Sequence, residues 1–115
     1  MKDNLIKTKT FQFSLSIIDL YRLLQQHKEF VISKQLLRSG TSIGANVEEA
    51  VAAESRADFT HKMSIASKEA RETLYWLRLL HESKLTLNIN YQPYIEEVQQ
   101  IINITTKIVK TSRKN

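Results

Sequence analysis

The chain has 115 residues and a formal net charge of +5, with only two glycines, one proline and no cysteine. This length fits one domain, and the scarcity of Gly and Pro leaves little material for hairpins or β-sandwiches. The absence of cysteine excludes disulfides, thiolate catalysis and cysteine-based zinc sites.

Basic residues are concentrated towards both chain ends. Residues 1–28 and 83–115 each hold five basic and two acidic side chains, whereas residues 29–82 are almost neutral. Such an excess favours a polyanionic partner such as RNA, although a solubilising surface explains so small a charge equally well. The N-terminal residues lack the apolar run of a signal peptide, and no stretch reaches membrane-spanning length. We expect a soluble cytoplasmic protein with no membrane contact.

The first two predicted helices cover residues 11–27 and 30–53. Apolar side chains recur there at the spacing of one helix face: Phe13, Ile17, Leu20 and Leu24, then Ile32, Leu36, Ile43, Val47 and Ala50. Gly40 and Gly44 lie one turn apart in the second helix, where each glycine costs about 1 kcal/mol relative to alanine. We therefore expect another helix to approach closely, and we assign both glycines to a contact between copies. The chain's own helix is the alternative partner.

The other two helices are predicted over residues 55–83 and 92–111. Ser55 followed by Asp58 forms a capping-box-like start, and Pro93 is tolerated in the first turn of the last helix. Four amphipathic helices joined by short turns predict an all-α, antiparallel up-down-up-down four-helix bundle.

The third predicted helix carries more apolar residues than one core stripe needs. Beside its core seam runs a second stripe: Ile65, Glu69, Glu72, Trp76 and Leu79. In a lone bundle its apolar members would be largely solvent-facing, which commonly marks an interface. We assign this stripe to contacts between copies. The alternative is an irregular bundle in which this stripe packs beneath the longest predicted loop, residues 84–91.

A third stripe of the same helix is basic and contains an aromatic residue: Lys68, Arg71, Tyr75 and Arg78. Arginine and lysine at this spacing can follow a phosphate backbone, while the tyrosine can stack on a base. We assign these residues to nucleic-acid binding, together with Lys34 and Arg38 of the second helix and Lys107 and Lys110 of the tail. An ordinary solvated helix face is the alternative interpretation.

Evidence for catalysis is weak. A di-metal bundle needs Glu-x-x-His pairs, and the chain contains none, so we assign no metal, no cofactor and no catalytic residue. The spacing of Arg56 and His61 is similar to the Arg-x4-His arrangement of HEPN-type ribonucleases, but Ala57 replaces the usual polar residue after the arginine. A two-residue match arises easily by chance, so a ribonuclease using this pair remains only an alternative.

Two segments resemble a known family. They are SxQLLRSGTSIGANVEEA at residues 33–50 and DFxxKxxIAxKEAxExxYWLxLL at residues 58–80. Both closely resemble the four helix bundle proteins, also called large-subunit ribosomal RNA intervening-sequence proteins. The resemblance implies a small antiparallel bundle assembled into a ring, often a pentamer, with no established catalytic activity. Many members are encoded within insertions in ribosomal RNA genes. Val31 departs from the family, in which many members have proline there.

Related proteins are the accessory variability determinants of diversity-generating retroelements, which the resemblance implies bind nucleic acid and a reverse transcriptase. The expected function is thus a non-enzymatic, self-assembling bundle that contacts RNA or a nucleic-acid-processing protein. A purely structural module without nucleic-acid binding is the alternative.

Overall fold

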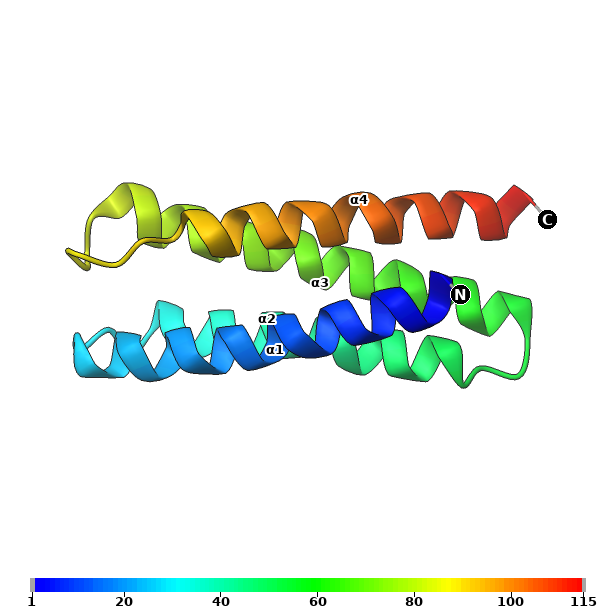
Figure 1. The fold of residues 1–115 in the computed structure, drawn as a ribbon, viewed down its shortest axis with the longest axis horizontal. Coiled ribbons are helices and arrows are strands. Elements are labelled where there is room, and N and C mark those ends of the chain that lie inside the picture. The colour runs from blue at the N-terminus through cyan, green and yellow to red at the C-terminus, as the bar shows by residue number, and fades with distance from the viewer. Residues whose placement is uncertain (1, 115) are drawn as a thin grey trace.

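The computed structural model describes residues 2–114, with side chains from Leu5 onward (Figure 1). It contains four helices, α1 (Lys2–Gln26), α2 (Ile32–Val51), α3 (Arg56–Ser83) and α4 (Gln92–Lys114), and no strand within the described range. The predicted all-α class with four helices is confirmed.

The start of α1 lies well before residue 11, where the sequence pattern placed it. Ile6 is fully buried, and so is Thr10, whose hydroxyl donates to the carbonyl oxygen of Ile6 at 2.8 Å. These two residues continue the face of Phe13 and Ile17 towards the N-terminus. The buried threonine satisfies its polar group within its own helix, so it can occupy a core position that a search for apolar residues overlooks.

The four helices form two layers, with α1 and α4 in front of α2 and α3 in Figure 1. Each helix contacts two others, through the pairs α1–α2, α2–α3, α3–α4 and α1–α4. Within the described residues, no Cα atoms of the diagonal pairs α1–α3 and α2–α4 approach within 8 Å of each other. The α1–α2 turn and the α3–α4 loop lie at one end, and the start of α1 and the end of α4 lie near the other (Figure 1). The basic C-terminal part of α4 therefore lies towards one end of the bundle, whereas Lys28 and Lys84, in the two connections, lie towards the other.

Side-chain caps define where α2 and α3 begin. The carboxylate of Glu29 accepts hydrogen bonds from the backbone N–H groups of Val31, Ile32 and Ser33, at 3.2, 3.1 and 2.6 Å. This carboxylate satisfies the orphan amides of the first turn, so α2 begins without the proline common in the resembled family. At α3, the Ser55 hydroxyl accepts from the backbone N–H of Asp58 at 3.1 Å, as the capping pattern predicts.

All four helices contribute to one hydrophobic core, which includes the apolar faces predicted for α1 and α2. A buried hydroxyl pair joins α2 to α3: the Thr73 hydroxyl donates to the Glu69 carbonyl oxygen at 2.8 Å and shares a hydrogen bond with the Ser39 hydroxyl at 2.9 Å. No described buried side-chain polar atom lacks a hydrogen-bond partner. The polar residues at this interface are therefore compatible with a stable core.

The α3–α4 loop is anchored by Tyr91, whose ring is 1% exposed and whose hydroxyl hydrogen-bonds that of Thr86. Burial is the main cause that raises the pKa of Tyr91 above its ordinary value. The pKa of Tyr94 is raised as well, by burial and then by the Asp19 carboxylate. The folded chain therefore keeps these phenolic protons to higher pH than the unfolded chain does.

We expect the bundle to lose stability as the pH rises above about 10, where tyrosines of the unfolded chain ionise. The stabilisation that comes from the raised tyrosine pKa values is complete below the pKa of tyrosine in the unfolded chain. It is lost as the pH rises towards the higher pKa of the folded chain. Tyr91→Phe should make urea-unfolding free energies less dependent on pH in this range. Tyr75→Phe, at a ring that is 54% exposed, is the matched control. An identical alkaline loss in wild type and Tyr91→Phe would contradict the expectation.

Candidate functional site

A basic depression lies between α3 and α4, and its polar and basic lining comes from both helices. Arg71 of α3 donates from Nη2 to the Thr106 hydroxyl oxygen of α4 at 2.9 Å. Residues Arg71, Ile102, Asn103, Thr106, Lys107 and Lys110 line the depression, which we call the α3–α4 groove. The fold thus brings together three residues that the sequence analysis assigned to nucleic-acid binding from separate segments: Arg71, Lys107 and Lys110.

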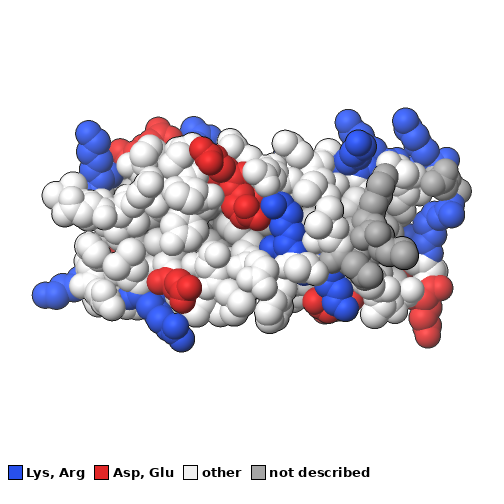
Figure 2. All heavy atoms as spheres, viewed as in Figure 1, with Lys and Arg blue, Asp and Glu red and all other residues white. Residues whose placement is uncertain are grey.

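The charge of this groove is uncompensated. Lys107 and Lys110 are exposed, and neither lies within ion-pair distance of a carboxylate among the described residues. From residue 98 to 114, α4 has four basic residues and no acidic one. Figure 2 shows basic side chains over this part of α4. Lys68, also exposed, precedes Arg71 by about one turn. Such a groove can bind phosphate groups through its cations and through the Asn103 amide.

Tyr75 and Arg78 lie farther along α3, towards the α3–α4 loop. The Tyr75 ring packs edge-on against Trp76, with ring centroids 5.1 Å apart. Arg78 lies 3.5 Å from the Glu82 carboxylate one turn on, with both side chains largely exposed. The two residues border a separate depression with Leu79 and Ser83. Tyr75 remains accessible to a base, whereas the charge of Arg78 is partly compensated.

The structure separates Arg38 and Lys34 from this groove, contrary to their assignment to the same basic surface. The Arg38 guanidinium forms ion pairs with Glu72 and, at 3.4 Å, with Glu69. Lys34 is exposed one turn earlier on α2. Neither residue is part of the lining of the α3–α4 groove. Arg38 belongs instead to a charged cluster between α2 and α3.

The second stripe of α3 is more buried than predicted. All five of its residues, Ile65, Glu69, Glu72, Trp76 and Leu79, are half-buried rather than solvent-facing. Trp76 packs against the core, and its indole N–H donates to the Glu72 carboxylate at 3.0 Å. The cause is α2, which lies beside this stripe and covers part of it with Arg38. What remains accessible is the outer surface of α2 and α3 together, which we call the α2/α3 face.

The two glycines contact α1 of the same chain. A Cβ added at Gly40 would lie 2.9 Å from Ile17 Cγ2, and one added at Gly44 would lie 3.3 Å from the Thr10 carbonyl oxygen. Both glycines are buried in the α1–α2 contact. This corrects their assignment to a contact between copies, because a buried residue is not accessible to another chain. The alternative partner, the chain's own helix, is the observed one.

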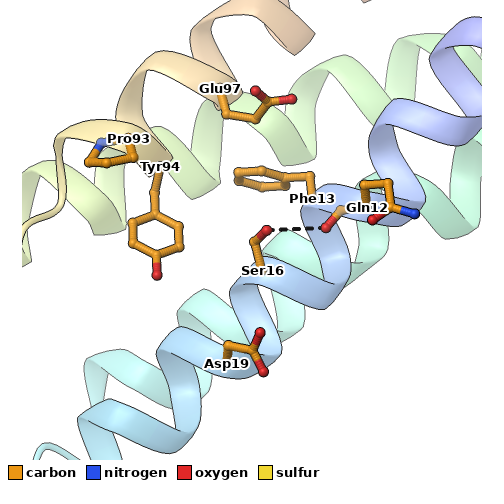
Figure 3. Close-up of a pocket in the computed structure, with 7 residues that line it drawn as sticks. All are labelled: Gln12, Phe13, Ser16, Asp19, Pro93, Tyr94 and Glu97. Atoms are coloured by element: carbon orange, nitrogen blue, oxygen red, sulfur yellow. Dashed lines mark hydrogen bonds between the residues drawn. The ribbon is translucent and has the colours of Figure 1, made fainter.

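A second groove, not expected from the sequence, lies between α1 and α4. Its lining is Gln12, Phe13, Ser16, Asp19, Pro93, Tyr94 and Glu97 (Figure 3). Glu97 pairs with Lys9 at 2.7 Å, and Ser16 donates to the Gln12 carbonyl oxygen at 3.2 Å. The one available signal in the sequence is that residues 10–18, TFQFSLSII, carry no charge.

The structure adds no support to the ribonuclease alternative. Arg56 and His61 are both exposed near the start of α3. Among the described residues, no three His, Asp or Glu side chains are grouped so that they could hold a metal ion. In the described part of the chain, none of the helices is long and apolar enough to cross a bilayer.

Comparisons with known proteins connect this geometry to one family. The family model described as 23S rRNA-intervening sequence protein matches residues 2–107. A solved structure from Bacteroides thetaiotaomicron, described as a protein with unknown function from the S23 ribosomal protein family, is 48% identical. Its TM-score is 0.89, and the alignment covers 96% of this chain and 99% of that chain. Among curated proteins, none matches the sequence significantly.

Proposed function

Because the chain belongs to the 23S rRNA-intervening sequence protein family, we propose that it acts without catalysis as a self-assembling RNA-contacting bundle. The observation that carries this proposal is the α3–α4 groove, where Arg71, Lys107 and Lys110 converge without a carboxylate in the lining. The RNA phosphates would lie along these cations, and the exposed Tyr75 would stack on a base beyond them.

The proposal includes location and assembly. The bundle would be an antiparallel up-down-up-down unit in the cytoplasm, assembled as a ring-shaped homo-oligomer, with five copies as the resemblance implies. The α2/α3 face supports assembly because the half-buried Ile65 and Leu79 keep part of their surface accessible beside the charged cluster of Arg38, Glu69 and Glu72. Its partners are other copies of itself and an RNA or a nucleic-acid-processing protein.

Neutralising the groove tests RNA binding. We expect Lys107→Gln/Lys110→Gln to weaken binding of a labelled RNA oligonucleotide about tenfold, because two phosphate contacts are lost. Fluorescence anisotropy at fixed salt measures the change. Lys28→Gln/Lys84→Gln removes the same charge at the opposite end and should leave the affinity within about twofold.

Arg38→Gln is a second control, and it should change RNA affinity little because two glutamates already compensate this arginine. Equal weakening by all three variants would show only a general dependence on net charge. Absence of RNA binding by wild type would favour the purely structural module. RNA cleavage that His61→Ala abolishes would favour the ribonuclease.

A further inference from the structure

The outer side of α1 is unusually apolar for an exposed helix face. Leu5, Phe11 and Leu15 are 63, 56 and 44% exposed, while Phe13 and Ile17 on the opposite side are buried. An exposed helix face normally carries charged side chains, but residues 10–18 contain none. Aromatic enrichment together with depletion of charge is the composition of the centre of a protein–protein interface.

The α1–α4 groove continues this surface. In Figure 3 the Phe13 and Tyr94 rings lie in the space between the two helices, with Pro93 beside Tyr94. Two of the lining residues are acidic, Asp19 and Glu97, and Glu97 is paired with Lys9. Figure 2 shows the same side of the molecule with large uncharged areas over α1. The outer side of α1 and this groove together form what we call the α1/α4 face.

The dimensions of the bundle decide which surface can hold a partner. The molecule measures 47 × 22 × 20 Å, so a long face offers roughly 1,000 Å² and an end roughly 440 Å². A stable protein interface buries about 800 Å² on each side. The exposed Phe30, Val31, Leu85 and Leu87 gather at one end, which is too small for such a contact. The α1/α4 face is large enough.

We propose that the α1/α4 face of one copy docks onto the α2/α3 face of a second copy. This inference rests on the self-assembly in the proposed function and identifies the surface that the sequence left out. The two faces lie on opposite layers of the bundle (Figure 1), so the contact is heterologous. Heterologous contacts repeat from copy to copy and close into a ring or extend as a filament. Pairing two α1/α4 faces would instead leave Ile65 and Leu79 uncovered.

The same geometry leaves the α3–α4 groove accessible in every copy. That groove lies on the side between the two docking faces, because α3 belongs to one layer and α4 to the other. Successive copies would therefore present their basic grooves in a row, and one RNA strand could engage several of them.

Complementary interface variants test the contact by sedimentation. One variant carries Phe11→Glu/Leu15→Glu on the α1/α4 face, and the other carries Ala45→Glu/Leu79→Glu on the α2/α3 face. Ala45 is exposed and shares the stripe of Arg38 and Glu49, the α2 residues that pair with α3. Ala45→Glu alone is the fallback variant if the Leu79 change disturbs folding, which circular dichroism detects.

We expect each variant alone to be monomeric at a concentration where wild type assembles. An equimolar mixture should form a dimer and nothing larger, because one intact face remains on each variant. Assembly of the Phe11→Glu/Leu15→Glu variant like wild type would overturn the inference while leaving self-assembly standing. A dimer of the other variant by itself would show pairing of like faces and also overturn it. A monomeric wild type would refute the self-assembly itself, whereas RNA binding by the groove is measured independently.

Discussion

Gly40→Val is expected to lower the free energy of unfolding by about 2–3 kcal/mol. A Cβ at this position would lie 2.9 and 3.0 Å from the Cγ2 and Cγ1 atoms of Ile17, closer than packed side chains approach. Ile17 is fully buried, so it cannot withdraw without displacing the core between α1 and α2. The higher helix propensity of valine relative to glycine recovers only a few tenths of a kcal/mol. Urea unfolding followed by circular dichroism measures the loss.

Ala45→Val is the matched control for Gly40→Val at a protein concentration where wild type is monomeric, because it adds a β-branched side chain to an exposed site on the same helix. Ala45→Val should lower the free energy of unfolding by only about 0.6 kcal/mol, which is the difference in helix propensity between alanine and valine. The Gly40→Val/Ile17→Ala double variant should lose less stability than the sum of the two single variants, because the clashing atoms are removed and the two changes couple. If Gly40→Val proved as stable as Ala45→Val, the close contact of α1 with α2 would be contradicted.

Phe13→Ala is expected to lower the free energy of unfolding by about 3–5 kcal/mol, whereas Phe11→Ala should lower it by no more than about 0.5 kcal/mol. The Phe13 ring is 2% exposed, and its loss would leave a cavity beneath the α1–α4 groove. Phe11, two residues earlier, points away from the core. The pair thus separates folding from assembly, since Phe11 is the residue proposed to contact a second copy.

The phenylalanine comparison needs denaturation and sedimentation on the same two variants. Denaturation is best done at a protein concentration where wild type is monomeric, because assembly adds to apparent stability. Phe13→Ala should unfold at lower urea, and Phe11→Ala should fold normally but assemble poorly. Similar destabilisation by both substitutions would mean that the outer side of α1 is packed against its own chain.

Much of the fold follows from local sequence patterns. The faces containing Phe13 and Leu36 have a clear helical period, and the Ser55 cap fixes the start of α3. The early start of α1 was missed because Thr10 occupies a core position that the apolar period leaves empty. A buried threonine bonded to its own helix leaves no signal of that kind in the sequence.

The candidate site was harder to predict because it depends on which helices are neighbours. In the sequence, Arg71 and Lys107 each have other basic residues nearby. Only the contact of α3 with α4 places the two in one groove. Arg38 has the same local context and lies between α2 and α3, where glutamates compensate it. Similarly, Gly40 indicates a close helix contact but not whether the neighbour belongs to the same chain. Such distinctions require the three-dimensional arrangement.

Wild-type RNA affinity measured across a salt series tests the proposed function most directly. Binding through Lys68, Arg71, Lys107 and Lys110 should give a log–log dependence of the association constant on salt with a slope of about −3 for single-stranded RNA. The Lys107→Gln/Lys110→Gln variant should reduce that slope by roughly half. An affinity independent of salt, or no binding at the lowest salt, would contradict the assignment of the α3–α4 groove as an RNA-binding surface.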